Sequence, residues 1–336
     1  MRCICPFSRW ARLSSRLLRT SINCLGETKP IFTEIFNSNP LVFCTVAGLF
    51  GLLVGSFLNV VIYRIPAMMD REERDWHQAY NARNEQPDTT PEAAAEKPFN
   101  LLQPGSSCPK CGAPVKAHQN IPILSYLFLR GRCANCGVKI ALRYPVIEGL
   151  TAAVSVLVAW HFGFSVACGG ALILSWTLIA LTCIDLDRLW LPDRITLPLL
   201  WFGLGFSLLT GADGSAVFAD PRSSIIGALA GYLSLWSLYH GFKRVTGKQG
   251  MGYGDFKLLA ALGAWLGWQM LLIIVLLSAV VGLVAALGMI LFRGHDRQTP
   301  IPFGPYLAVA GFIALLWGPE LLTAWLGSGI QASPLQ

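Results

Sequence analysis

Residues 258–292 read LLAALGAWLGWQMLLIIVLLSAVVGLVAALGMILF, a run of 35 residues without a charged side chain. Residues 149–184, GLTAAVSVLVAWHFGFSVACGGALILSWTLIALTCI, form a second run of the same kind. A charged side chain at the centre of a membrane helix costs roughly 2.5 to 3.5 kcal/mol, so long uncharged runs mark membrane spans. One span needs about 20 mostly apolar residues, and each of these runs therefore has room for two helices.

The composition of the whole chain agrees with this interpretation. Of its 336 residues, 54% are hydrophobic and 13% are charged, and the mean hydropathy is +0.52. A soluble globular protein has about 25% charged residues, so this class is excluded. We place breaks in the two long runs at residues 161–163 and 267–269. Four further uncharged intervals bring the total to eight spans: 35–63, 195–212, 223–242 and 298–319. The sequence predicts an all-α polytopic membrane protein with about eight transmembrane helices.

Basic residues indicate the orientation in the membrane. Of the 26 Lys and Arg residues, 19 fall in the loops that eight spans place on one face, and the opposite loops between spans carry only Arg222. Lys and Arg accumulate in cytoplasmic loops, so the first face is predicted to be cytoplasmic. These loops beside anionic lipid account for the net charge of +7, and we expect membrane lipid rather than nucleic acid as the partner. The basic loops are 64–144, 185–194, 243–257 and 293–297.

The loop 64–144, between the first and second spans, changes in character along its length. Residues 66–98 are charged and contain no aliphatic run, which favours a flexible or loosely helical linker. Residues 99–144 contain two C-x-x-C-G sequences, with cysteines at Cys108, Cys111, Cys133 and Cys136. Four thiolates at this spacing are typical of a tetrahedral zinc site, and each following glycine permits the tight turn. Two disulfides are the alternative, but the cytoplasm is reducing. We expect a closed, structural zinc site in a small cytoplasmic domain.

Aspartates at the predicted membrane boundary are the candidates for catalysis. Asp185 and Asp187 end the third span, Asp193 precedes the fourth, and Asp255 precedes the sixth, all on the same face. We expect Asp185 and Asp255 to meet and to share one proton near neutral pH. One carboxylate then activates water while the other protonates a carbonyl oxygen, which is aspartic-protease chemistry. Gly252 and Gly254 would let an extended substrate backbone approach Asp255.

A structural role is the alternative for all of these aspartates, because Asp residues at helix ends are often solvated caps. This interpretation is favoured for Asp187 and for Asp193, which follows Pro192 and precedes an apolar run as an N-cap does. It is disfavoured for Asp255, since two glycines before a membrane-edge carboxylate are an unusual way to cap a helix.

Five sequence motifs together resemble those of bacterial prepilin peptidases, the membrane aspartic proteases with a G-x-G-D motif. The likeness covers residues 40–326, nearly the whole chain. Besides the paired C-x-x-C sequences, the motifs are GSFLNVV at 55–61, Ile184-Asp185 followed by Leu191-Pro192-Asp193, MGYGDFK at 251–257 and TPIPFGP at 299–305.

The resemblance implies a bifunctional inner-membrane enzyme. Such enzymes cut the basic leader from type IV prepilins and type II secretion pseudopilins at the cytoplasmic face, and then methylate the new N-terminal residue with S-adenosylmethionine. The family's catalytic aspartates correspond to Asp185 and Asp255, and its zinc site to the four cysteines. No Rossmann-type glycine fingerprint is present, so no residue is assigned to S-adenosylmethionine. The alternatives are a proton-coupled transporter and a non-enzymatic pilus-assembly scaffold.

The predicted organisation is an extension (1–34), a first transmembrane helix (35–63), the cytoplasmic loop (64–144), a seven-helix membrane peptidase domain (145–326) and a tail (327–336). The extension departs from the family, whose members begin close to the first span. It carries six basic residues on the face where the positive-inside rule disfavours them. We interpret it as a start assigned too early; an interfacial amphipathic helix is the alternative.

Overall fold

The computed structural model describes residues 31–85, 99–211, 214–248, 251–293 and 302–326, and these ranges are helical in most of their length. They contain three isolated β-bridges and no longer strand. The all-α prediction is therefore confirmed for the described ranges. Most of the extension (1–30) and the tail (327–336) lie outside them; α2 (Ile31–Ser38) leads into the first long helix.

Helix α3 (Pro40–Glu85) is much longer than the predicted first span. Its 46 residues extend about 69 Å, more than twice the roughly 30 Å of a hydrocarbon core. The helix continues through Pro66 into the segment predicted as a flexible or loosely helical linker, so its first part, to residue 85, is helical. The physical reason is that residues 67–85 contain no Gly or Pro and many good helix formers, such as Ala, Met, Arg and Glu.

Both breaks predicted inside the long uncharged runs are confirmed. The first run forms α5 (Arg143–Phe162) and α6 (Val166–Arg188), separated at Gly163, and the second forms α9 (Tyr253–Leu266) and α10 (Trp268–Arg293), separated at Gly267. The two glycines have φ of +59° and +83°, a region in which L side chains are strained. Each helix thus ends where glycine allows the chain to reverse.

Each of the eight predicted spans overlaps one long helix, the remaining ones being α7 (Asp193–Phe206), α8 (Pro221–Thr246) and α11 (Gly304–Leu326). Five helices among the described residues are long and apolar enough to cross a membrane: α3, α5, α6, α10 and α11. Helices α7 and α9 have 14 residues each, about 21 Å, which is shorter than the hydrocarbon core. The chain is a multi-pass helical membrane protein, and the count of eight spans stays a prediction.

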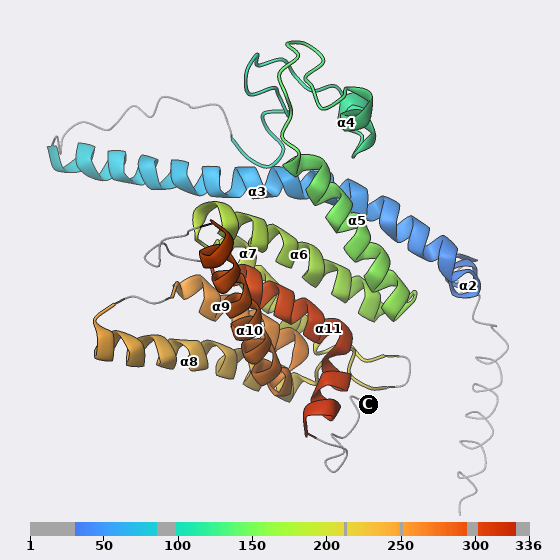
Figure 1. Ribbon diagram of the computed structural model, residues 1–336, viewed down its shortest axis with the longest axis vertical. Coiled ribbons are helices and arrows are strands. Elements are labelled where there is room, and N and C mark those ends of the chain that lie inside the picture. Colours follow the sequence, from blue (N-terminus) through green and yellow to red (C-terminus); the bar gives the residue numbers. More distant parts are fainter. Residues whose placement is uncertain (1–30, 86–98, 212–213, 249–250, 294–301, 327–336) are drawn as a thin grey trace, which may run out of the picture.

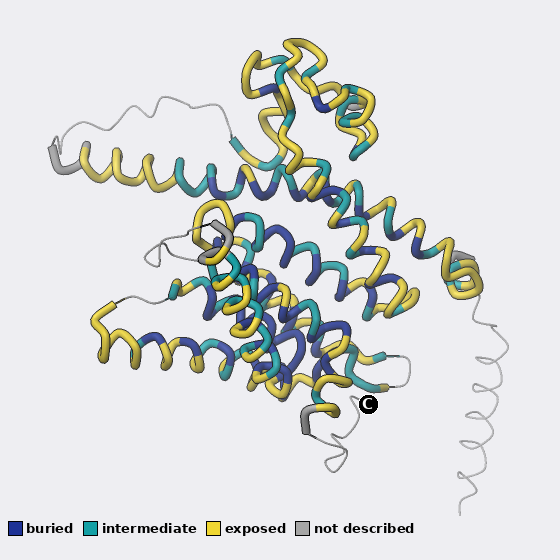
Figure 2. The backbone as a smooth tube through the Cα atoms, viewed as in Figure 1, coloured by how far each residue is buried: buried dark blue, intermediate teal, exposed yellow. Residues whose placement is uncertain are grey.

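Helix α9 lies at the centre of the bundle formed by α6–α11 (Figures 1 and 2). Nearly all its residues are buried, and it packs against α7, α8, α10 and α11. Close packing on α8 depends on Gly227, because a Cβ added there would lie 2.2 Å from the carbonyl oxygen of Gly263. Glycines four residues apart, as in 227–231, typically permit such contact between membrane helices. The indole of Trp265 also donates to the Leu199 carbonyl of α7 at 2.8 Å.

The cysteine-containing module, residues 99–142, lies on the opposite side of α3 from the bundle (Figure 1). It contains the 3₁₀ helix η1 (Ala117–Asn120) and the short helix α4 (Leu124–Phe128). Buried Arg64 of α3 donates hydrogen bonds to the carbonyls of Asn100, Leu101 and Pro104. Buried Glu148 of α5 accepts one from the backbone of Ile123 at 2.8 Å. These contacts hold the module against α3 and α5.

Candidate active site

Asp185 and Asp255 come together at one end of the bundle. Asp185 lies in the last turn of α6 and Asp255 in the first turn of α9, with exposed fractions of 4% and 7%. Leu191 contacts both Gly254, next to Asp255, and Gly304, whose N–H binds Asp185, so the two carboxyl groups lie at one junction. Two buried carboxyl groups so placed are the arrangement that acid–base catalysis requires. The juxtaposition expected from the membrane depth of these residues is present.

The start of α11 also lies at this site, next to Asp185. The backbone N–H of Gly304, the first residue of α11, donates a hydrogen bond to Oδ2 of Asp185 at 3.1 Å. A Cβ at Gly304 would lie 2.6 Å from the same oxygen, so only glycine allows this approach. We did not predict Gly304 as a site residue. The signal was a glycine between Pro302 and Pro305 directly before an apolar helix.

The two glycines of the G-x-G-D motif have different environments. A Cβ at Gly254 would lie 2.7 Å from Cβ of Leu191, a buried residue between α6 and α7. Gly254 therefore allows α9 to begin tightly against that connection, a packing role that we did not expect. Gly252 is the N-cap of α9, and the nearest atom to a Cβ there would be Oδ2 of Asp255 at 3.8 Å. Substrate approach at Gly252 stays a prediction.

The neighbouring aspartates form ion pairs at exposed positions. Asp187 accepts from Arg143 of α5 at 2.6 Å, and Asp193 accepts from Lys257 of α9 at the same distance. The N-cap expected at Asp193 was wrong: Pro192 is the N-cap of α7, and it makes no side-chain cap bond. The ion pair with Lys257 uses the Asp193 carboxylate instead. It links the start of α7 to the start of α9, two residues from Asp255.

The four cysteines gather into one cluster. Their Sγ atoms all lie within 4.8 Å of one another, and those of Cys108 and Cys136 are 3.8 Å apart. A tetrahedral zinc ion with bonds of about 2.3 Å separates its sulfurs by about 3.8 Å, so the cluster fits this metal. All four cysteines are free rather than disulfide-bonded. A site closed by four protein ligands is structural, because it leaves no position for water or substrate.

The two halves of the cysteine cluster have the same local structure. In each half the glycine after the second cysteine donates its N–H to the carbonyl of the first cysteine at 2.9 Å. These glycines, Gly112 and Gly137, have φ of +68° and +70°, as their predicted role in the turns requires. Asn135 donates a hydrogen bond to Sγ of Cys111. This bond and a hydrogen bond from the backbone of Ala113 lower the pKa of this thiol to about 6, which favours the thiolate that binds metal.

Both halves of the chain match models of known protein families. Residues 49–162 match the Bacterial Peptidase A24 N-terminal domain, and residues 172–287 match the Type IV leader peptidase family. The boundary between the two matches falls at the connection between α5 and α6. No solved structure gives a significant match.

Several curated relatives are similar over most of their length, and each bears the name prepilin leader peptidase/N-methyltransferase. The relative from Aeromonas hydrophila is 52% identical over 88% of this chain and 97% of its own. The relative from Pseudomonas aeruginosa is 49% identical over 86% of this chain and 95% of its own length. The relative from Neisseria gonorrhoeae is 51% identical over 80% of this chain and 88% of its own length. On this similarity, and with both carboxyl groups and all four thiols in place, the chain belongs to the type IV leader peptidase family.

Proposed function

We propose that this protein cleaves the leader from prepilins with Asp185 and Asp255 and then N-methylates the new N-terminal residue with S-adenosylmethionine. The observation that carries the proposal is the meeting of two buried carboxyl groups from α6 and α9. Membership of the family and the name of the curated relatives support both activities. Zinc in the four-cysteine cluster contributes to folding and takes no part in cleavage.

The two aspartates have distinct roles in the proposed cleavage. Asp185 accepts a hydrogen bond from the N-terminus of α11, where the helix dipole favours a negative charge, so Asp185 is assigned as the base. It takes a proton from water, whose oxygen attacks the scissile carbonyl carbon. Asp255 is assigned as the acid and protonates the carbonyl oxygen. The tetrahedral intermediate then breaks at the C–N bond: the amine leaves with a proton from Asp185, and one hydroxyl group returns its proton to Asp255 as the carbonyl re-forms.

The position of the pair suits a substrate with a charged leader and an apolar helix. Asp185 and Asp255 lie at the end of the bundle from which the basic loops 185–194 and 243–257 emerge. By the positive-inside rule this is the cytoplasmic end, in a bacterial inner membrane. We infer that the apolar helix of a prepilin or type II secretion pseudopilin lies in the bilayer beside the bundle, with its leader junction at Asp185 and Asp255.

Purified full-length enzyme in detergent, incubated with a synthetic prepilin, tests the proposal. We expect Asp185→Asn and Asp255→Asn each to lower the rate of leader release by about 10² to 10⁴-fold, because asparagine keeps the size but transfers no proton. With S-adenosylmethionine, the mature fragment should gain about 14 Da, the mass of one added CH₂.

Asp187→Asn and Asp193→Asn are the matched controls, since both residues lie at the same helix ends but form exposed ion pairs. They should remain within about tenfold of wild type. Equal cleavage by all four variants would refute the assignment of Asp185 and Asp255. No cleavage by the wild type would contradict the proposed function and favour the scaffold or transporter alternative.

A further inference from the structure

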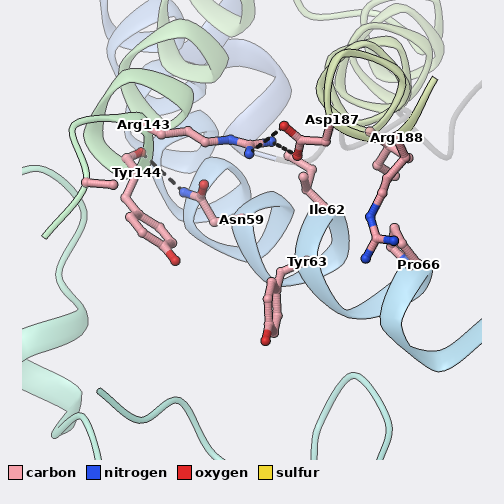
Figure 3. Close-up of a pocket in the computed structure, with 10 residues that line it drawn as sticks. Asn59, Ile62, Tyr63, Pro66, Arg143, Tyr144, Asp187 and Arg188 are labelled. Atoms are coloured by element: carbon pink, nitrogen blue, oxygen red, sulfur yellow. Dashed lines mark hydrogen bonds and ion pairs between the residues drawn. The ribbon is translucent and has the colours of Figure 1, made fainter. Parts of the chain in front are cut away.

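A cavity lies next to the catalytic pair, between α3, α5 and α6 (Figure 3). Its volume is about 250 Å³, and the proposed cleavage mechanism does not use it. Its lining combines apolar side chains with six polar, charged or aromatic ones: Asp187 and Arg188 of α6, Asn59 and Tyr63 of α3, and Arg143 and Tyr144 of α5.

The cavity and the catalytic pair lie on different faces of the same helix end. Asp185 faces α11, where it accepts from Gly304, whereas Asp187 pairs with Arg143 of α5. Two residues along an α-helix are separated by about 200°, which places these side chains on nearly opposite sides. Since a helix with its side chains is about 10 to 12 Å across, the cavity is close to the cleavage centre but separate from it.

The lining residues include a pair of opposite charges, an amide and two tyrosine rings. Arg143 and Asp187 supply a fixed pair of opposite charges, joined by two contacts of 2.9 and 2.6 Å. Asn59 donates to the carbonyl of Tyr144 at 3.2 Å, which holds α3 against α5 at the wall of the cavity. Figure 3 shows the rings of Tyr63 and Tyr144 and the guanidinium of Arg188 extending toward the same open side.

We propose that this cavity binds S-adenosylmethionine, which this inference takes as the methyl donor from the proposed function. Arg188 forms an exposed ion pair with Asp70 at 3.2 Å, and an exposed pair of this kind is weak enough for Arg188 to exchange Asp70 for the α-carboxylate of the amino acid. A carboxylate suits the ammonium group or the ribose hydroxyls, and tyrosine rings suit the face of adenine. The mixed charge disfavours a purely anionic ligand such as a phosphate. The volume lies just below the roughly 300 to 1,000 Å³ typical of ligand pockets, and the open side at Tyr63, which is 71% exposed, adds room.

The proposed site explains how one chain performs two reactions in order. When bound, the sulfonium group supplies a methyl group: the amine lone pair forms the N–C bond, the C–S bond breaks with its electrons left on sulfur, and the amine loses a proton to solvent. The amine that receives the methyl group exists only after cleavage at Asp185 and Asp255. It must then move around the end of α6 by about one helix diameter. Methylation therefore follows cleavage and depends on residues that cleavage does not need.

Binding of radiolabelled S-adenosylmethionine to purified full-length protein, measured by equilibrium dialysis, tests the site directly. The test protein is a double variant, Tyr63→Ala with Tyr144→Ala, and its conservative counterpart replaces both residues with Phe. Alanine removes the rings, and we expect the dissociation constant to rise at least about tenfold, as loss of base stacking does. The phenylalanine variant keeps both rings and should remain within about threefold. The control is Tyr80→Ala on the same helix, because Tyr80 is 54% exposed and stacks on Trp76 outside the cavity.

The products of cleavage and methylation, weighed by mass spectrometry on the same samples, distinguish a failure of this proposal from a failure of the proposed function. We expect the double alanine variant to release the leader at a rate close to that of wild type while the 14 Da addition, one CH₂, is lost. Unchanged binding in this variant would overturn the proposed site. A wild-type enzyme that cuts the leader but binds no S-adenosylmethionine would overturn it too and leave the peptidase assignment standing.

Discussion

The backbone N–H of Gly304 donates a hydrogen bond to Oδ2 of Asp185 although 119 positions separate the two residues in the chain. This contact joins the first residue of α11 to the last turn of α6, directly beside the start of α9, which carries Asp255. The candidate catalytic centre is thus a junction of three helix ends, with a glycine at the point of closest approach.

Gly304→Ala should damage cleavage without unfolding the protein. The added Cβ would lie 2.6 Å from Oδ2 of Asp185 and force this carboxylate to move. A misplacement of about 1 Å costs roughly 10²-fold in rate, so kcat/KM for leader release should fall by about that factor. The control is Gly169→Ala in α6, where nothing lies within 4 Å of the new atom. Equal rates for both variants would contradict the proposed contact.

Cys108→Ser should release the metal and weaken the module more than it weakens cleavage. The four Sγ atoms form one cluster, and loss of one ligand opens the tetrahedral site. Elemental analysis should show about one zinc per wild-type chain and far less in the variant. We expect lower thermal stability or methylation with smaller loss of leader release. Cys183→Ser, a cysteine outside the cluster, is the control, and unchanged zinc content in Cys108→Ser would show that the site is not formed as described.

Gly227→Ala should separate α8 from α9. A Cβ at this position would meet the carbonyl oxygen of Gly263 at 2.2 Å, so one backbone must shift. Overpacking of this kind costs about 1 to 3 kcal/mol, and the midpoint of thermal unfolding in detergent should fall accordingly. Gly241→Ala on the same helix adds a methyl group to open space and should unfold at or slightly above the wild-type temperature. A wild-type midpoint for Gly227→Ala would argue against this close contact.

Arg64→Met should loosen the cysteine module from α3. The buried guanidinium donates to three carbonyls at the start of the module, and methionine leaves those acceptors without their donor. Limited proteolysis should therefore cut residues 99–142 faster in the variant than in wild type. The comparison is Arg74→Met, an exposed arginine on the same helix, which should be cut at the wild-type rate. Equal protection of both variants would mean that other contacts hold the module.

Much of the site could be predicted because local sequence patterns specify it. Uncharged runs indicated the membrane helices, and the breaks at residues 161–163 and 267–269 were confirmed because glycine ends helices through its own backbone freedom. The cysteine spacing indicated the metal cluster for a similar reason, since each C-x-x-C-G turn forms within five residues. The extent of α3 was underestimated because the charged segment was interpreted as a flexible or loosely helical linker, whereas charged residues with good helix propensity continue a helix into water.

What the sequence by itself determined is the set of elements and the chemical groups they carry: uncharged helices, two cysteine turns and aspartates at helix ends. Only the tertiary structure decided which groups meet. The ion pairs of Asp187 and Asp193, the packing of Gly254 on Leu191 and the contact between Gly304 and Asp185 all join residues from different parts of the bundle. Helix formation depends on bonds between residues four apart, whereas these contacts depend on how helices pack, which side-chain shape and close glycine approach set over the whole bundle.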